Sequence, residues 1–542
     1  MTWLGWFFLI AYLLLGASWY KVFEKAGKPG WQALIPGYNY WIACDIIGRK
    51  PLHALWMLFP IVNLFIHSGI VIDIARSFGR YTFLDSLLAV VAGPFYFAWL
   101  GANGDKFISP VMARERDYAA QIQAAKEKSN DKLVQKLERD NPFRKSAIRE
   151  WAEAIIFAVF AAGFIRMFLI EAYVIPTPSM EGSLLVGDFL FVSKAHYGLR
   201  LPQTVAMIPL LHNRIPVFDR ESYLSKPGLP YRRLKALESV DRNDPVVFNI
   251  PSGDSVFVFP DRTWTIEDFR YGAVQEANPG YHARIASGRK PLTVRPVDKK
   301  DHYIKRCVGI AGDSLQIINR QLYINGRPAD NPSTLQYMYI ARFPSGNINT
   351  QEFSNWGISS TDFQPLDSRR FPSNSYLLYA TEVEKDKVQG MDQNIVIEPI
   401  NFDSLRQNPL KLFPHAPEYY PNWSLDNYGP IWIPKAGASI PLTPANIAMY
   451  RRCIAVYEGN TLEVRNGKAY INGKETDTYT FKMNYYWMMG DNRHNSEDAR
   501  FWGFVPEDHI VGKPLFIWFS LKENSLAKGI NWGRIFTSAD KR

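Results

Sequence analysis

Ser179 stands in a setting that raises a question of chemistry. It lies in YVIPTPSMEGSLLVGDFLFVSKAHYG (173–198), between a proline and a methionine, directly after a long apolar run. A serine in such a place is most often only a turn residue. Its hydroxyl is a weak nucleophile, and it does covalent chemistry only beside a base that takes its proton. The role of Ser179 therefore depends on a base elsewhere in the chain.

Histidine is the usual base for a serine, and the chain has nine of them. His53 and His67 lie in or near apolar runs, and His302 and His494 lie in β-rich motifs. The sequence contains neither a G-x-S-x-G elbow nor an H-E-x-x-H metal pair. A Ser-His-Asp triad thus has no local support, and we expect neither a metal nor another cofactor.

Lys305 is the more attractive base. It lies in HYIKRCVGIAG (302–312), a stretch that reads as a strand facing a core. Burial disfavours the charged form of a lysine and lowers its pKa, so that the amine can accept a proton. The alternative is a lysine whose stem packs while its amine reaches the solvent.

The chain contains an internal repeat, in which Lys305 has a positively charged counterpart. YIKRCVGIAGDSLQIINRQLYINGRP (303–328) resembles MYRRCIAVYEGNTLEVRNGKAYINGKE (449–475), with Cys307 matching Cys453 and Lys305 matching Arg451. The repeat predicts two copies of one strand–hairpin unit, with both cysteines in the core. Arginine does not lose its proton in proteins, so only the first copy can supply a base.

A third polar segment could support such a base. MMGDNRHNSEDARFWGFVPEDHIVGKPLF (488–516) concentrates Gly, Asp, Asn and Arg between apolar strands. The run is either a tight turn or a set of residues that hold a catalytic side chain. A calcium-binding EF-hand loop is excluded because Arg493 stands at the third ligand position.

The elements that must position these residues begin with membrane segments. Apolar runs long enough, or nearly so, to cross a bilayer are predicted at Trp3–Tyr20, Leu55–Ile74, Thr82–Leu100 and Trp151–Glu171. Lys and Arg gather in residues 20–52 and 113–150, which places both on the cytoplasmic side. Four crossings then put everything after Glu171 outside, with the topology of the middle spans left open.

Composition and sequence pattern limit the possible folds and functions of the rest of the chain. Its net charge is +10 over 542 residues, with only three cysteines, and no nucleic-acid-binding pattern occurs. The polar stretch 113–150 predicts one charged, solvated helix that serves as a spacer. From Tyr173 onward, short β-rich stretches and Asn-Gly turns dominate, as in NRQLYINGRP (319–328) and RNGKAYINGKE (465–475). The predicted fold is a multi-pass α-helical membrane region followed by a mainly β, antiparallel extracytoplasmic domain with a large insert.

Four motifs together resemble the bacterial type I signal peptidases, membrane-bound Ser-Lys endopeptidases that remove signal peptides from exported proteins. They are IPTPSMEGSLLVGDFLFVSKAHYG (175–198), VDRNDPVVFNIP (240–251), YIKRCVGIAGDSL (303–315) and MGDNRHNSEDARFWGFVPEDHIVGK (489–513). The insert and the additional spans resemble the long Bacteroidetes-type form. Residues 26–63 look like a small membrane domain of unknown function that is attached to some of these enzymes.

The resemblance implies a role for each matching residue. Ser179 would be the nucleophile, Lys305 its base, and Thr177 with the Ser179 N–H the oxyanion hole. The supporting residues would be Ser496, which would hydrogen-bond the lysine amine, the ion pair Asp498 and Arg500, and Met180 after the nucleophile. His494 departs from the acidic residue common in the family, and Pro178 from a small residue.

The resemblance also implies a domain order and partners. We expect a membrane domain (1–112), a cytoplasmic linker (113–150), an anchor (151–172), a peptidase domain (173–330 and 449–522), an insert (331–448) and a tail (523–542). The partners would be signal-peptide-bearing preproteins, the lipid bilayer and, transiently, the export machinery, with no nucleic acid. The location would be the inner membrane, with the peptidase domain on the periplasmic side.

Other readings remain open at this point. A Ser-Lys autoprotease of the repressor-cleaving kind shares the dyad, but the chain lacks a DNA-binding domain. A non-enzymatic membrane scaffold would use the insert to bind peptides or glycans, although aromatic residues more often fill a core. Leu184, Leu185, Phe189 and PLFIWFS (514–520) either contact lipid headgroups or pack inside. The substrate is expected to bind extended, along an exposed strand edge.

Overall fold

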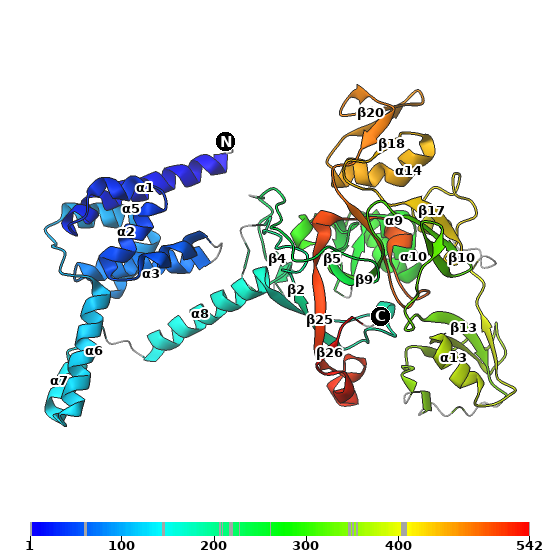
Figure 1. Cartoon of the computed structure of the whole chain (residues 1–542), viewed down its shortest axis with the longest axis horizontal. Coiled ribbons are helices and arrows are strands. Elements are labelled where there is room, and N and C mark those ends of the chain that lie inside the picture. Colours follow the sequence, from blue (N-terminus) through cyan, green and yellow to red (C-terminus); the bar gives the residue numbers. More distant parts are fainter. Residues whose placement is uncertain are drawn as a thin grey trace. The chain divides into compact units, whose positions relative to one another are not determined.

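The protein forms two compact units, which are described separately. Unit 1 comprises residues 1–165 and 207–211, and unit 2 comprises residues 166–206 and 212–542. The computed structural model describes residues 3–58, 62–143, 147–204, 207–208, 210–215, 220–226, 228–260, 262–344, 348, 352–353, 356–402 and 409–540. Figure 1 shows a helical N-terminal part and a mainly β remainder.

Unit 1 is a group of helices with apolar side chains both inside and outside. Its first helices are α1 (Trp3–Lys25), α2 (Tyr38–Ile47), α3 (Val62–Ser77), α4 (Phe83–Val91) and α5 (Gly93–Ala102). Its core includes Trp19, Val22, Phe23, Ile47, Ile70, Ile74 and Phe97. Large apolar side chains are also exposed, among them Leu52, Trp56, Leu64, Phe83, Leu84, Phe95 and Trp99. Helices that are apolar on all sides are typical of a surrounding without water.

The predicted membrane runs are interrupted in the structure. Among the described residues, no individual helix has both the length and the apolar character to cross a bilayer. Helices α4 and α5 meet these requirements only as a pair, and they are bent by 118° at Ala92. The run Leu55–Ile74 is divided between a 3-10 helix (Pro51–Leu58) and α3. The number of crossings therefore stays a prediction.

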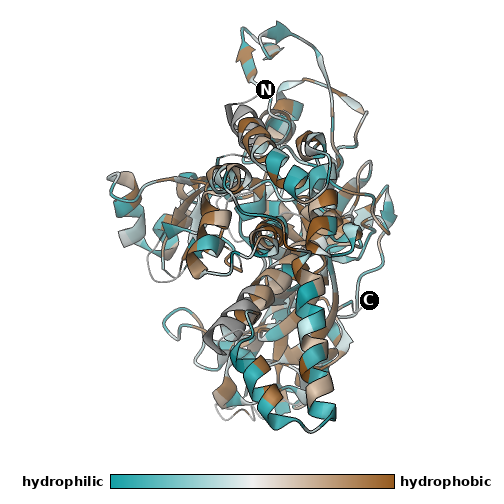
Figure 2. Ribbon diagram, turned by 90° about the vertical axis from the view of Figure 1, so that its left-hand side faces the viewer, coloured by the Kyte–Doolittle hydropathy of each residue, from teal (hydrophilic) through white to brown (hydrophobic). Residues whose placement is uncertain are grey.

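The charged stretch forms two helices, so the prediction of one helix is wrong. Helix α6 (Val111–Glu127) and helix α7 (Asp131–Arg139) are separated by Ser129, whose φ is 51°. The Asn130 side chain accepts a hydrogen bond from the N–H of Leu133 and caps α7. In Figure 2 this helical pair is largely hydrophilic.

Unit 2 is built around one antiparallel sheet, which confirms a mainly β domain. The sheet order is β1-β2-β25-β5-β9-β23-β24. Helix α8 (Ala147–Phe168) leads directly into β1. The strands are β1 (Ile170–Val174), β2 (Asp188–Ser193), β25 (Ile510–Ser520), β5 (Pro245–Asn249), β9 (His302–Gly309), β23 (Tyr485–Met489) and β24 (Val505–Pro506). Consequently, motifs that are far apart in the sequence lie on neighbouring strands.

The hairpins of the internal repeat are present in both copies. The first copy holds β10 (Ser314–Ile318), β11 (Gln321–Ile324) and β12 (Arg327–Pro328), and the second holds β19 (Leu462–Arg465), β20 (Lys468–Ile471) and β21 (Lys474–Glu475). Asn325, Asn466 and Asn472 begin Asn-Gly turns with positive φ, as predicted. The fourth turn, between β10 and β11, uses Asn319 and Arg320 instead.

The strand that precedes the hairpin occurs only in the first copy, so two copies of the whole unit is a wrong prediction. The residues that match β9 form the helix α14 (Pro444–Arg452) and a π-helical turn (Cys453–Tyr457). Thr443 caps α14 by accepting from the N–H of Asn446, and Pro444 occupies the first turn. Both features favour a helix start. Cys307 and Cys453 nevertheless lie buried in one core, as predicted.

The predicted insert has a sheet of its own. It consists of β13 (Tyr337–Arg342), β14 (Phe363–Pro365), β15 (Ser375–Ala380) and β16 (Val396–Pro399), with the helix α13 (Glu382–Gln389). Its aromatic residues fill a core, as expected, including Tyr337, Tyr339, Phe343 and Phe353. The later strand β17 (Tyr428–Trp432) pairs with β10 instead. The insert is therefore joined to the rest of unit 2 by strand pairing.

Candidate active site

Ser179 and Lys305 lie in hydrogen-bond contact. Ser179 belongs to a short 3-10 turn (Pro178–Met180) that follows β1, and Lys305 lies near the middle of β9. The Nζ atom of Lys305 is 2.7 Å from the Oγ atom of Ser179. The two residues are only 4% and 8% exposed. This is the arrangement of a nucleophile beside its proton acceptor.

The surroundings of Lys305 favour its neutral form. Strand β9 lies between β5 and β23, and Lys305 is paired with Val246 of β5. Burial lowers the pKa of the amine to about 8, although the carboxylates of Asp498, Glu497 and Asp491 act in the opposite direction. An amine with this pKa is partly unprotonated near neutral pH, which a base requires.

The amine makes a second contact that fixes its direction. Nζ also donates to the carbonyl oxygen of Ile304 at 3.0 Å, and it lies 5.4 Å from the ring centre of Tyr303. When the amine is neutral, its lone pair can receive the proton of the Ser179 hydroxyl while one N–H still bonds to Ile304. Proton transfer within this pair therefore needs no rearrangement of the lysine side chain.

The residues on either side of Ser179 differ in exposure. Thr177 is extended, with φ −131° and ψ 153°, and its side chain is exposed. Met180 is 1% exposed and packs in a small core with Ile175 and Leu184. The buried methionine holds the turn in place, whereas the threonine hydroxyl stays accessible to a bound substrate.

Ser496 does not make the hydrogen bond to Lys305 that the resemblance implied. Its Oγ atom is buried and has no hydrogen-bond partner among the described residues. The reason is that the lysine amine points toward Ser179 and Ile304 and bonds to these two residues instead. Ser496 nevertheless lines the same pocket as Lys305. A neutral amine with one further N–H would have a buried acceptor available in Ser496.

Asp498 and Arg500 form a fully buried ion pair. Their side chains meet through two contacts, of 2.9 Å (Nε to Oδ1) and 2.8 Å (Nη2 to Oδ2). Asp498 also accepts from the N–H of Gly490 at 3.1 Å. Arg500 donates to the carbonyl oxygens of Arg493 and Leu425. The pair thus fastens both ends of the loop 490–498.

Two further contacts were not foreseen from the sequence. The N–H of Asn492 donates to the carbonyl oxygen of Ser179 at 3.2 Å. Arg306, which is fully buried, binds Asp491 through bonds of 2.8 Å and 2.7 Å. Successive residues of a strand point to opposite faces, so Arg306 supports the site from the face opposite Lys305. This alternation of side chains along a strand was the sequence signal that could have placed Arg306 behind the site.

Ser179 and Lys305 open into a pocket of about 910 Å³. Thr177, Ser496 and Tyr173 line it, together with Arg262 and Tyr271 from the segment between β5 and β9. Strand β1 is the first in the sheet order, so among the residues that the structure describes its outer edge has no partner strand in that sheet. A pocket beside a free edge can take a peptide in an extended conformation.

Comparison with protein families shows to which family the chain belongs. The family described as "Signal peptidase, peptidase S26" matches residues 148–388 and 479–519, which include Ser179, Lys305 and the whole loop 490–498. This chain belongs to the signal peptidase family. It is therefore a serine endopeptidase that acts on signal peptides.

Relatives of this signal peptidase align over most of the chain. A protein named Signal peptidase I from Buchnera aphidicola subsp. Baizongia pistaciae is 23% identical over 385 residues, covering 70% of this chain and 79% of the relative. Signal peptidase I from Haemophilus influenzae is 24% identical, covering 71% and 74%. Signal peptidase I from Helicobacter pylori strain 26695 is 24% identical, covering 72% and 90%.

Three parts of the chain lie outside the peptidase match: residues 1–147, 389–478 and 520–542. Residues 31–110 match a family of unknown function, DUF5684. This agrees with the predicted resemblance of residues 26–63 to an attached domain of unknown function. Residues 389–478 fall between the two matched parts of the peptidase family. They include β17 and the second hairpin unit.

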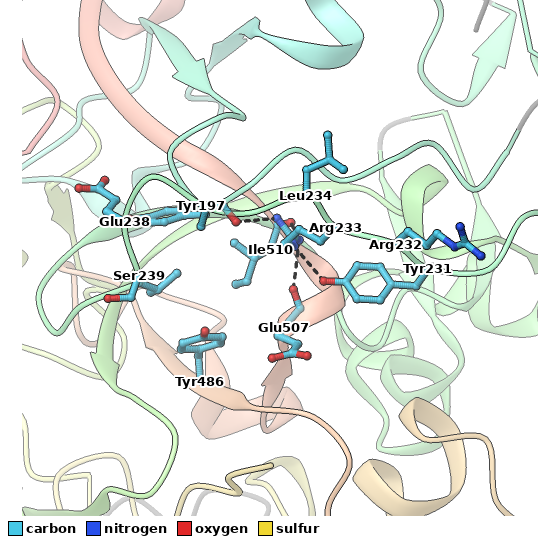
Figure 3. Close-up of a pocket in the computed structure, with 12 residues that line it drawn as sticks. Tyr197, Tyr231, Arg232, Arg233, Leu234, Glu238, Ser239, Tyr486, Glu507 and Ile510 are labelled. Carbon is cyan, nitrogen blue, oxygen red and sulfur yellow. Dashed lines mark hydrogen bonds between the residues drawn. The ribbon is translucent and has the colours of Figure 1, made fainter. Parts of the chain in front are cut away.

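A second pocket of this signal peptidase has a structural explanation. Figure 3 shows Arg233 at its centre, and it shares no lining residue with the pocket of Ser179. The Arg233 guanidinium donates to the hydroxyl of Tyr231 and to the carbonyl oxygens of Tyr197, Gly198, Glu507 and Ile510. All its donors are in use, so Arg233 braces the chain and leaves no N–H for a ligand.

Proposed function

We propose that Ser179 and Lys305 form the catalytic dyad of this signal peptidase. The observation that carries the proposal is the 2.7 Å contact between a buried amine and a buried hydroxyl. Neutral Lys305 takes the hydroxyl proton while Ser179 Oγ bonds to the scissile carbonyl carbon. Lys305 then gives this proton to the leaving amine, and the peptide C–N bond breaks. Water loses a proton to the same lysine and releases the acyl group from Ser179.

The oxyanion hole in this proposal consists of the Thr177 hydroxyl and the Ser179 N–H. Thr177 lines the pocket and its hydroxyl is free to turn toward a carbonyl oxygen. Hydrogen-bond donors that point at the developing oxyanion are worth about 10²–10³ in rate each. Ser496 orients the neutral lysine, and the Asp498–Arg500 pair and Met180 hold the surrounding backbone.

We further propose an inner-membrane location with the peptidase domain on the extracytoplasmic side. The apolar exterior of unit 1 supports membrane spans in residues 1–112 and 151–172. An aromatic surface formed by Phe191, Phe516 and Trp518, next to the exposed Phe536, supports contact with lipid headgroups. Leu184, in contrast, is fully buried and packs in the core. The nucleophile then lies close to the bilayer surface, where a signal peptide ends.

The domain order from the sequence is retained as a proposal, with its peptidase parts at 173–330 and 449–522. The cytoplasmic linker comprises residues 113–150, the insert 331–448 and the tail 523–542. The separate core of the insert supports its treatment as a lobe. The preprotein substrate lies extended along β1, and contact with the export machinery is transient.

A preprotein cleavage assay with the full chain in lipid tests the dyad. Ser179→Ala and Lys305→Ala should each abolish cleavage while the protein still enters the membrane. Lys305→Arg should be inactive too, because its guanidinium keeps its proton. Cleavage at the wild-type rate by any of the three variants would refute the dyad.

A further inference from the structure

The segment that leads into the insert is hydrogen-bonded both to the loop 490–498 and to the segment that carries Ser179. The N–H of Gln336 donates to the carbonyl oxygen of Asp491 at 3.0 Å, and its own carbonyl oxygen accepts from Arg493 at 2.9 Å. On the side of the nucleophile, the hydroxyls of Thr334 and Ser183 are 2.8 Å apart. The start of the insert is therefore part of the support of the site, and the same loop 490–498 is its main contact.

His494 adds a side-chain link between this loop and the insert. Its Nδ1 atom accepts from the N–H of Met338, at 3.1 Å, in β13. Its Nε2 atom is 2.8 Å from Oδ1 of Asp426, which precedes β17. The imidazole is wholly buried, between the rings of Tyr337 at 5.5 Å and Phe402 at 4.3 Å. One ring thus joins the loop to two separate segments of the insert.

These two bonds select one form of the histidine. Because Nδ1 accepts, it carries no proton, and Nε2 must carry the proton that it donates to Asp426. Burial lowers the pKa of His494, which keeps this neutral form despite the nearby carboxylate. A carboxylate at position 494 would accept from Met338 but would face Asp426 with a like charge. Imidazole therefore fits this place because it accepts on one side and donates on the other.

The loop that His494 fastens also reaches the catalytic residues. The N–H of Asn492 bonds to the carbonyl oxygen of Ser179, and Ser496 lines the pocket of Lys305. Both residues are only two positions away from His494. The loop is short, so a shift at His494 must move one or both of them. A displacement of about 1 Å in a reacting group can cost about 10²-fold in rate.

We propose that His494 is a positioning residue: through its bonds to Met338 and Asp426, the insert holds the loop 490–498 in the position that keeps its contact with Ser179. The inference rests on the proposed dyad, whose geometry the loop would maintain. The insert then has a role in catalysis although it supplies none of the proposed catalytic groups. The role requires both bonds of the imidazole, which makes it testable bond by bond.

Single-turnover cleavage of a preprotein by the full-length enzyme in lipid tests this role. His494→Ala should lower the rate of the chemical step by about 10²-fold, while KM changes little. His494→Asn places its amide oxygen near the position of Nδ1 and should restore part of the rate. Tyr339→Phe is the matched control, since it removes a partly buried 2.7 Å hydrogen bond to Glu382 inside the insert. It should leave the rate unchanged.

A double-mutant cycle separates positioning from a general loss of folding. If His494 acts through Asp426, the double variant His494→Ala/Asp426→Asn should cleave as fast as His494→Ala alone. A wild-type rate for His494→Ala, a loss confined to KM, additive effects in the cycle, or an equal loss in Tyr339→Phe would each overturn the proposal. Ser179→Ala and Lys305→Ala in the same assay must be inactive; if they cleave, it is the dyad that fails.

Discussion

The amine of Lys305 meets the hydroxyl of Ser179 at 2.7 Å, although 126 positions separate the two residues in the chain. Lys305 lies on strand β9 in the interior of the sheet, and Ser179 lies in the turn that follows the edge strand β1. Within the described part of the chain, neither side chain is hydrogen-bonded to a carboxylate. Burial is therefore the main cause of the lowered pKa of the amine.

The first prediction concerns the pH dependence of cleavage. Since burial lowers the pKa of Lys305 to about 8, the neutral base is lost as pH falls below that value. We expect kcat/KM to fall about tenfold per pH unit well below pH 8 and to level off above it. Stopped assays over a pH series with one preprotein measure this. A profile that is flat between pH 6 and pH 8 would contradict a neutral lysine.

The second prediction concerns the oxyanion hole. Thr177→Val keeps the shape of the side chain but removes its hydroxyl, and should lower kcat by about 10²-fold with little change in KM. Thr177→Ser keeps a hydroxyl and should retain most of the activity. The threonine is exposed, so both variants should unfold at the temperature of the wild type. Equal rates for the two variants would exclude a role for the hydroxyl.

The third prediction concerns the space beside Gly490. A Cβ atom at this position would lie 2.4 Å from the carbonyl oxygen of Ser179 and 2.2 Å from Oγ of Ser496. Gly490→Ala must therefore push the nucleophile and Ser496 apart, and we expect cleavage to fall by about 10²-fold or more.

Gly533 supplies the control for this substitution. No atom lies within 4 Å of a Cβ built there, so Gly533→Ala should be neutral. Preprotein cleavage and thermal unfolding of both variants test whether a Cβ atom at position 490 disturbs the site. Wild-type cleavage by Gly490→Ala would show that the backbone around Ser179 is less constrained than the structure indicates.

The fourth prediction concerns the buried ion pair of the loop. Asp498→Asn leaves the guanidinium of Arg500 buried without its counter-charge, and should lower the free energy of unfolding by about 3–5 kcal/mol. Glu463→Gln breaks the exposed pair with Arg465 and should change it by less than about 1 kcal/mol. Denaturant unfolding of the solubilised protein measures both. Similar effects of the two substitutions would mean that burial of the pair is unimportant.

The fifth prediction concerns Glu181, close behind the nucleophile. Glu181 is 2% exposed, and burial together with the charge of Asp362 raises the pKa of its carboxyl to about 8. A carboxyl group with a raised pKa stabilises the folded protein most below about pH 4.5, and this contribution is lost as the pH rises toward 8.

Glu181→Gln cannot lose a proton, so it should be more stable than the wild type at pH 8 and lose this advantage toward pH 5. Each unit of pKa shift corresponds to about 1.4 kcal/mol. Glu418→Gln, at an exposed position, is the control and should follow the wild type at each pH. Thermal unfolding at a series of pH values measures the difference. An advantage that does not depend on pH would exclude this cause.

The sequence alone determined the features that depend on residue type and local pattern. Ser179 and Lys305 could be paired because a serine needs a base and because Arg451, the counterpart of Lys305, cannot serve as one. The Asn-Gly turns predicted the hairpins, since the conformation with positive φ is a local preference of these residues. The aromatic core of the insert followed from the same kind of local information.

Only the tertiary structure decided the features that depend on distant partners. The residues 449–457 match β9 in sequence, yet they form the end of α14 and a π-helical turn; here Thr443 and Pro444 were a local signal that the comparison of the two repeats did not use. Ser496 Oγ has no hydrogen-bond partner among the described residues because Lys305 turns toward Ser179 and Ile304. The link from His494 to Met338 and Asp426 joins segments that are 156 and 68 positions away. Such contacts arise from packing and strand order, for which a single sequence carries no local signal.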